Sequence, residues 1–135
     1  MRYDDWPTKL VESLKEAKNK PFVWGEHDCC LFAADIVKAM TGDDLAAGYR
    51  GKYSTAKEAI KLIKKISNDG TVAGIVDLHF KRVPVSFAKR GDIVSVQTNH
   101  GEAIGVCAGG GAHFVIESGT IIYPRPLWSI AWRVV

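Results

Sequence analysis

Apolar residues in the first half of the chain recur every three or four positions, which is the spacing of one face of a helix. This spacing predicts a first helix in the stretch 5–20, with Asp5 as its candidate N-cap. It predicts a second helix over roughly residues 29–41, because Asp28 can cap its start and Gly42 can end it in a left-handed conformation. The N-terminal half is therefore expected to be mainly helical.

A capping box predicts the start of a third helix. Thr55 is followed three residues later by Glu58, so each side chain can accept a hydrogen bond from the other residue's backbone N–H. The apolar face that follows consists of Ala59, Ile60, Ile63 and Ile66. The "SNDG" at residues 67–70 ends this helix, whereas "TVAGIVDLHF" at residues 71–80 fits either a short helix or a strand.

The second half of the chain changes character. Short runs rich in β-branched residues alternate with Gly, Asn and Pro, which is typical of strands joined by turns. These runs are "DIVSVQ" (92–97), "EAIGVCA" (102–108), "HFVIES" (113–118), "TIIYP" (120–124) and "AWRVV" (131–135). Helices followed by strands predict an α+β fold with an antiparallel sheet, and the length of 135 residues suits one domain over 1–135.

Composition narrows the functional classes. Hydrophobic residues make up 47% of the chain and charged residues 24%, as in ordinary globular domains. The 18 basic residues exceed the 15 acidic ones by a net charge of only +3, and they are spread along the chain. The one local group, "IKLIKKI", is typical of a solvated helix face. We therefore expect no nucleic-acid partner.

The three cysteines do not form a convincing disulfide framework, because Cys29 and Cys30 are neighbours and Cys107 is left over. This favours assembly in a reducing compartment. The N-terminus "MRYDDWPTKL" lacks the apolar core of a signal peptide, and no apolar run is long enough to cross a membrane. We therefore expect synthesis in the cytoplasm, with no signal peptide and no membrane span.

The stretch "PFVWGEHDCC" places two cysteines at the predicted start of the second helix. On a helical projection Cys29 shares the apolar face, whereas Cys30 lies about 100° round from it. The apolar face comprises Cys29, Phe32, Ala33, Ile36, Val37 and Met40, and the other faces carry Leu31, Asp35 and Lys38. A helix start offers free N–H groups and a positive dipole end, which lower the pKa of a thiol and can hold an oxyanion.

Cys29 is therefore the better nucleophile candidate of the two. The alternative is that it is a small buried hydrophobe, which is a common role for cysteine. The sequence contains no Cys-x-x-Cys or His-x-x-x-His spacing, so we expect no metal and no cofactor.

The longer stretch "PFVWGEHDCCLFAADIVKAMTG" resembles the nucleophile segment of NlpC-type cell-wall peptidases, a bacterial and phage branch of the papain-like cysteine hydrolases. "KRGDIVSVQ" and "EAIGVCAGGG" resemble two later strands of that family, in order, so that the match covers most of residues 20–117. More closely, "DCCLFAAD" with "RGDI", "AIGV" and "AWRV" is similar to a family encoded in the tail-gene modules of phages and prophages. The resemblance implies a papain-like fold, in which N-terminal helices include a cysteine-bearing helix packed on a C-terminal antiparallel sheet.

Carried over residue by residue, the resemblance makes Asp28 the helix cap and Cys29 the nucleophile equivalent. Cys30 takes the position that is normally a serine. Phe22 and Trp24 fall in the conserved segment before the cysteine and are expected to line the site with Cys30 and Ala103.

The departures from the family pattern concern the catalytic residues. Ala103 stands where the resemblance expects the catalytic histidine, and Phe22 stands where the family has a tyrosine. The third, polar residue would fall near Val115 or Ile116, and both are aliphatic. Loss of the base from such a catalytic unit can cost on the order of 10⁶ in rate.

Which of the four histidines could act as the base is not decided by the resemblance. His100 lies three residues before Ala103, roughly 10 Å along a strand and on its opposite face, unless a bulge or tight loop at "TNHGE" reverses it. His113 begins the next strand and is the second candidate base. His27 is expected to be an exposed loop residue, and His79 to be structural or exposed.

Two functions follow as expectations. The first is a phage tail-tip or tail-assembly component with a degenerate cysteine-hydrolase site, located in the virion tail and contacting other tail or baseplate proteins. The second is an active thiol peptidase or amidase that cleaves peptidoglycan stem peptides, with Cys29 as nucleophile and a displaced histidine as base.

Overall fold

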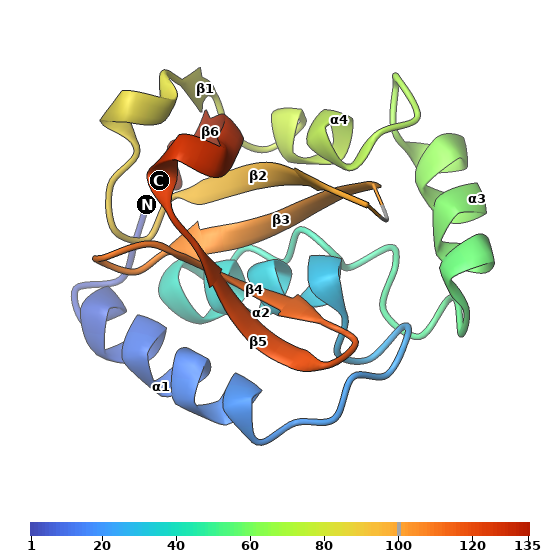
Figure 1. Ribbon diagram of the computed structural model, residues 1–135, viewed down its shortest axis with the longest axis horizontal. Helices are drawn as coiled ribbons and strands as arrows, with labels where there is room; N and C mark the ends of the chain where they lie inside the picture. Colours follow the sequence, from blue (N-terminus) through green and yellow to red (C-terminus); the bar gives the residue numbers. More distant parts are fainter. Residues whose placement is uncertain (100) are drawn as a thin grey trace.

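A computed structural model describes residues 1–99 and 101–135 of the protein. Its centre is a six-stranded antiparallel sheet with the order β1-β6-β2-β3-β4-β5 (Figure 1). The strands are β1 (Arg82–Val83), β2 (Ile93–Thr98), β3 (Gly101–Cys107), β4 (Ala112–Ile116), β5 (Gly119–Tyr123) and β6 (Trp128–Trp132). Short 3-10 helices at Val85–Phe87 and Arg125–Leu127 precede β2 and β6. The predicted α+β class with an antiparallel sheet is confirmed.

Four α-helices accompany this sheet in the described part of the chain. They are α1 (Trp6–Lys18), α2 (Cys29–Thr41), α3 (Ala56–Ile66) and α4 (Val72–Asp77). The ambiguous stretch 71–80 thus forms the short helix α4. None of the described helices is both long enough and apolar enough to span a membrane.

The helix boundaries follow their caps with one exception. The side chain of Asp28 caps α2, Gly42 ends it with φ +85°, and Thr55 accepts a hydrogen bond from the backbone N–H of Glu58. The Glu58 carboxylate reaches back to the N–H of Ser54, one residue before the predicted partner. Asp5 occupies the N-cap position of α1, but its side chain makes no capping hydrogen bond.

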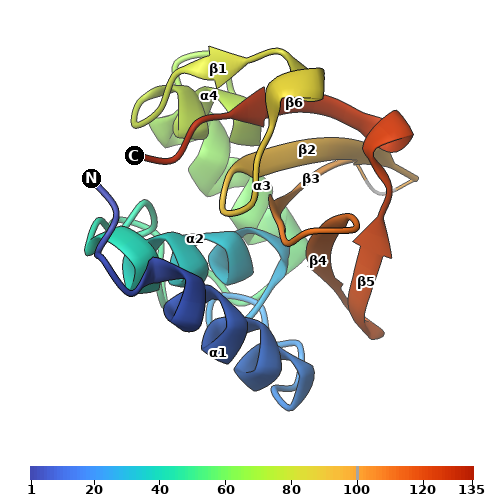
Figure 2. The same cartoon turned by 90° about the vertical axis from the view of Figure 1, so that its left-hand side faces the viewer.

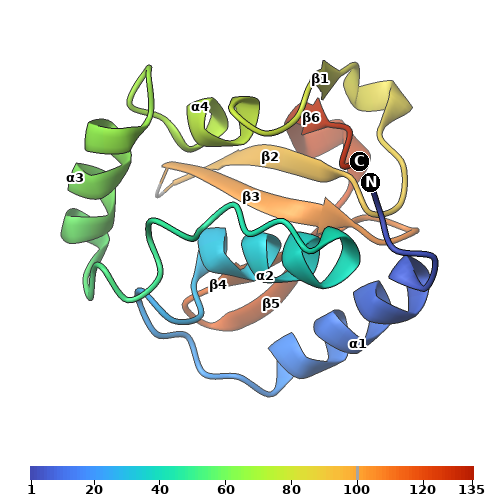
Figure 3. The ribbon, with the colours of Figure 1, turned by 180° about the vertical axis from the view of Figure 1, so that it is seen from behind.

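The cysteine-bearing helix α2 is the buried centre of the fold (Figures 2 and 3). It packs against α1 on one side and against β3 and β4 on another. The predicted apolar face is buried at Phe32, Ala33, Ile36, Val37 and Met40. Leu31, which was expected on another face, is also buried, because the segment after α2 adds Leu45 and Ala46 to the same core. Because α2 is covered on more than one side, apolar residues outside its predicted apolar face are buried as well.

The two faces of the sheet belong to different clusters. Ile93, Ile104, Val106, Val115 and Trp132 pack on the helical side. Val94, Val96, Ala103, Phe114 and Trp128 form the second cluster, on the other face. Side chains of successive strand residues alternate between the faces, so this division places Ala103 on the face that points away from the helices.

The last strand differs from the prediction. The expected strand was 131–135, but β6 ends at Trp132. The buried carboxylate of Asp92 accepts hydrogen bonds from the Val134 N–H at 3.1 Å and from the Arg133 Nε at 2.9 Å. The Arg133 N–H still donates to the Lys81 carbonyl at 3.0 Å, but the Val134 N–H binds a side chain instead of continuing the ladder.

Candidate functional site

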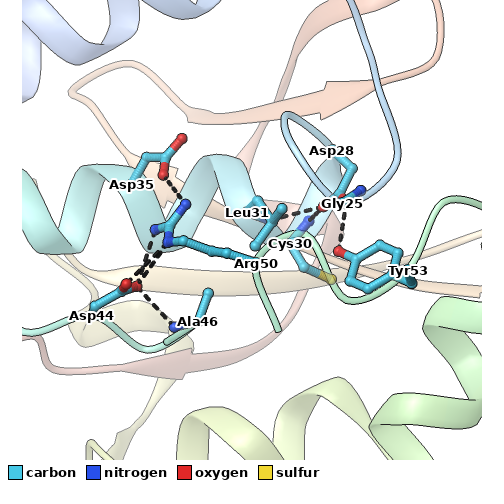
Figure 4. Close-up of polar contacts among 9 residues, drawn as sticks. All are labelled: Gly25, Asp28, Cys30, Leu31, Asp35, Asp44, Ala46, Arg50 and Tyr53. Atoms are coloured by element: carbon cyan, nitrogen blue, oxygen red, sulfur yellow. Dashed lines mark hydrogen bonds and ion pairs between the residues drawn. The ribbon is translucent and has the colours of Figure 1, made fainter. Parts of the chain in front are cut away.

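The buried carboxylate of Asp28 organises the start of α2 (Figure 4). Its Oδ1 accepts hydrogen bonds from the backbone N–H groups of Cys30 at 3.0 Å and Leu31 at 2.9 Å. Its Oδ2 accepts from the Gly25 N–H at 3.0 Å and from the Tyr53 hydroxyl at 2.5 Å. One side chain thus fixes the loop before α2, the first turn of the helix and a segment 25 residues further along the chain.

The loop before α2 must turn tightly to reach this arrangement. Val23 and His27 pair in an isolated antiparallel bridge, and Gly25 at the tip has φ +84°. A Cβ on Gly25 would collide with the carbonyl oxygen of Tyr53, while the Gly25 carbonyl accepts a hydrogen bond from the Gly51 N–H at 2.9 Å. Glycine is therefore required here both for its conformation and for the close approach of two segments.

Cys29 and Cys30 begin α2 with their sulfur atoms 4.0 Å apart. The Cys30 thiol, by donating to Cys29, lowers the pKa of Cys29, although burial and the charge of Asp28 oppose this effect. The same contact, together with burial, raises the pKa of Cys30 well above its ordinary value. Cys29 is therefore the sulfur that ionises more readily, which favours it as the nucleophile on grounds independent of the helical projection.

Both cysteines line a cavity of about 1130 Å³. Its walls come from the start of α2, the segment 45–53, the helices α3 and α4, and the end of the β2–β3 hairpin. Phe22 and Trp24, which were expected at the site, also line it, with their rings edge to face at 4.9 Å between centroids. The cavity is large enough for a ligand to reach the two thiols.

Tyr53 is a site residue that the sequence prediction missed. Burial and the neighbouring Asp28 raise its pKa, so the phenol stays protonated and donates to that carboxylate. Phe22 cannot supply a hydroxyl, and Tyr53 brings one to the cavity wall from a different segment. The only sequence signal was an aromatic residue in the glycine-rich connection "AAGYRGKYS".

An arginine holds that connection against α2. The Arg50 guanidinium contacts Asp35 of α2 at 2.6 Å and Asp44 at 3.0 Å (Figure 4). The ion pair keeps the pKa of Asp44 below its usual value. This contact anchors the segment between Tyr49 and Tyr53, which forms one wall of the cavity.

The described histidines lie away from this cavity. His113 is not among the lining residues, and burial followed by the charge of Lys18 lowers its pKa. His79 is exposed. None of His27, His79 and His113 hydrogen-bonds Cys29, whereas the other candidate base, His100, lies outside the described residues. The closest described neighbours of that position in the chain, Asn99 and Gly101, do line the cavity.

His27 corrects one expectation. It was expected to be exposed, but only 6% of its surface is accessible, because the bridge to Val23 folds the loop back over the molecule. Its ring stands edge to face against Phe32, with 6.4 Å between centroids. Neither ring nitrogen has a hydrogen-bond partner among the described residues, and burial lowers its pKa. His27 is therefore a buried neutral imidazole.

Ala103 does not lie where a catalytic histidine would face α2. Ala103 borders the cavity, but its methyl group packs in the second cluster, on the face of β3 away from α2. Its neighbour Glu102 lies on the helical side of β3, like Ile104 and Val106, and its Oε1 accepts a hydrogen bond from the Ala73 N–H of α4 at 3.1 Å. At the expected third position, Val115 packs in the helical core and Ile116 lines the cavity.

Comparison with known families places the chain. A family model described as a domain of unknown function (DUF6950) matches residues 1–134. The chain belongs to this DUF6950 family. No curated protein matches the chain.

One group of side chains in the DUF6950 domain could be considered for a metal ion. The ligand atoms of Asp28, Cys29 and Cys30 lie within 4.8 Å of one another. The Asp28 oxygens, however, already accept four hydrogen bonds from buried or partly buried donors. A cation would have to displace these donors, so the group does not fit a resident metal.

Proposed function

We propose that this DUF6950 domain is a divergent NlpC-type, papain-like domain that serves as a component of a phage tail tip or of its assembly. In this proposal it is made in the host cytoplasm, becomes part of the virion tail and contacts other tail or baseplate proteins. The resemblance in residues 20–117 motivates the proposal. The packing of the cysteine-bearing helix α2 on an antiparallel sheet supports it.

One observation carries the choice of a non-catalytic role. Cys29 lies at a buried helix start on an open cavity, yet no described histidine lines that cavity. A thiol hydrolase needs a base within hydrogen-bond reach of its nucleophile. Ala103, which stands where the resemblance expects the base and packs in the second cluster, favours binding over turnover.

The test is made in the phage or prophage that encodes the chain. We expect mass spectrometry of purified particles to detect the protein, and deletion of its gene to give defective tails. The Cys29→Ala protein should restore tails as well as the parent does, because the thiol is not needed for binding. Intact, infective particles that form without the chain would overturn the proposal.

A second candidate function is favoured by the electrostatics of Cys29. The lowered pKa of this thiol and its place at a helix start suit attack on an amide carbonyl of a peptidoglycan stem peptide. The N–H groups of Cys30 and Leu31 already donate to Asp28. The N–H of Cys29 itself would therefore have to stabilise the oxyanion.

Muropeptide analysis after incubation with purified protein separates the two functions. An active hydrolase would cleave stem peptides, would lose that cleavage in Cys29→Ala and would keep most of it in the matched variant Cys107→Ala. Cys107 is buried in the second cluster and does not line the cavity. The proposed tail component should leave the muropeptide profile unchanged in all three forms.

A further inference from the structure

The charges around the cavity are one-sided. The protein carries 18 basic and 15 acidic residues, but the charged side chains that line the cavity in the described part of the chain are Asp28, Glu102 and Glu117. No described lysine or arginine lines it. The charged lining of the cavity is therefore acidic within residues 1–99 and 101–135, although the net charge of the protein is +3.

The three carboxylates are not equivalent. Asp28 is buried and its oxygens are occupied by hydrogen-bond donors of the chain. Among the described residues Glu102 accepts one hydrogen bond, from the Ala73 N–H, and Glu117 is exposed at the turn after β4. Neither Glu102 nor Glu117 forms an ion pair with a described residue. Arg82 is near enough to feel the charge of Glu102 but pairs with Asp77, so both carboxylates are left without an ion pair within the described structure.

Another part of the cavity wall is apolar and incompletely covered. Helix α3 lies far from both chain termini (Figures 1 and 3) and contributes no isoleucine to the core. Ile60 is 54% exposed, and both Ile60 and Ile63 line the cavity together with Val72 and Ile75 of α4. Of the predicted apolar face of α3, Ala59 is buried, Ile63 is partly buried and Ile60 remains largely exposed beside the cavity.

We propose that the cavity binds a peptide segment of a partner protein that presents a lysine or arginine among apolar side chains. This inference rests on the proposed function and specifies the partner of the same cavity. The apolar side chains would cover α3 and α4, because burial of such surfaces stabilises association. The cation would pair with Glu102 and Glu117 and lie near the rings of Phe22 and Trp24, which can also attract a cation.

The size of the cavity agrees with a peptide. Sites for small organic ligands span roughly 300–1,000 Å³, whereas this cavity has about 1130 Å³. An extended segment that enters beside Trp24 and follows α3 would pass the two thiols without requiring any reaction there. The binding is therefore expected to persist when Cys29 is replaced by alanine.

The probe is an array of pentapeptides in which the central residue is lysine, arginine, norleucine or glutamate and the flanking residues are either apolar or polar. The full-length protein is expected to retain peptides that combine a basic centre with apolar flanks. The best peptide, labelled with fluorescein, then gives affinities in solution by anisotropy. Equal retention of the norleucine or glutamate peptides would overturn the charge assignment, and equal retention of polar flanks would overturn the apolar one.

Substitutions in the protein test the same contacts. Glu102→Gln removes the charge but keeps the acceptor for the Ala73 N–H. The double variant Glu102→Gln/Glu117→Gln removes both charges. Each single change should weaken the lysine peptide by about three- to tenfold and leave the norleucine peptide unchanged. Glu12→Gln removes an exposed carboxylate of α1 that does not line the cavity and should change neither affinity.

The outcomes also separate this inference from the proposed function. Loss of tails on gene deletion, together with unchanged peptide affinity in the double variant, would overturn the peptide inference alone. Selective binding of basic peptides to a chain that is dispensable for particles would overturn the tail role and keep the cavity assignment.

Discussion

Two buried aspartates each hold separate segments of this domain together, and they do so in different ways. Asp92 accepts hydrogen bonds from the guanidinium groups of Arg2 and Arg133, each at 2.9 Å, and thereby joins the two chain termini to the sheet. Asp28 accepts only from neutral donors, three backbone N–H groups and the Tyr53 hydroxyl. Both carboxylates are fully buried.

The difference lies in where the negative charge is compensated. At Asp92 two arginines pair with the carboxylate, so that this cluster as a whole carries one net positive charge. At Asp28 no described cation forms an ion pair with the carboxylate, and its charge opposes ionisation of both Cys29 and Cys30. The aspartate at the termini thus has its charge paired with cations, whereas the aspartate of the site has no ion-pair partner among the described residues and its charge acts on the neighbouring thiols.

The largest effect is expected at Asp92, the aspartate that pairs with two arginines. Asp92→Ala leaves two partly buried arginines without their partner, together with the N–H groups of Lys89 and Val134. The free energy of unfolding should fall by about 3–5 kcal/mol, because removal of one member of a buried ion pair leaves the remaining charges desolvated without compensation. Urea denaturation measures this change. Asp4→Ala, at an exposed position, is the control and should change stability little.

The Asp28 cluster should lose less stability when one of its neutral donors is removed. Tyr53→Phe deletes the hydroxyl that donates to Asp28 while keeping the ring in the cavity wall. A hydrogen bond to a charged group contributes about 1.5–3 kcal/mol, so denaturation should show a loss in this range. Tyr3→Phe is a matched control at a more exposed position. An equal loss in the control, or no loss in Tyr53→Phe, would show that the hydroxyl does not anchor this region.

The buried imidazole next to Asp28 predicts a pH dependence. Folding lowers the pKa of His27, so the unfolded chain binds the proton more tightly than the folded protein does. The contribution of His27 is therefore fully present above its unfolded pKa of about 6.5 and is lost as the pH falls through and below that value. The free energy of unfolding should decrease between pH 7 and 5. His27→Phe should flatten this slope, and His79→Phe, at an exposed residue, should not.

The smallest effect concerns the two thiols. Because donation from Cys30 lowers the pKa of Cys29, Cys30→Ala should raise that pKa and slow alkylation of Cys29 by iodoacetamide at pH 7 about two- to fivefold. Peptide mapping measures the rate at this residue. Cys107, whose pKa burial raises to about 12, serves as the control, and Cys107→Ala should leave the rate unchanged. Faster alkylation in Cys30→Ala would contradict the assigned direction.

Local signals carried much of the prediction. The bounds of α2 were predicted because Asp28 and Gly42 act on their immediate neighbours in the chain. The strands β2 to β5 were recognised from their composition and turns, which are local as well. The strand β1 was not predicted, since two residues carry too little pattern to stand out.

The remaining features depend on contacts between distant segments. Nothing near Tyr53 in sequence shows that its hydroxyl reaches Asp28, and nothing near His27 shows that a bridge buries it. The facing of Ala103 likewise depends on the register of β3 against β2, where it pairs with Val96. A shift of one residue reverses a strand's faces, so alignment of short strands by composition does not settle which side chain meets the helix.

The sequence by itself determined the α+β class and the start of α2 at Cys29, because caps and helical periodicity act within a few residues. Only the tertiary structure decided that Tyr53 completes the Asp28 cluster, that the described histidines lie off the cavity and that Ile60 of α3 stays exposed. These features arise when segments tens of residues apart compete for the same buried surface, and that competition is settled by packing of the whole chain.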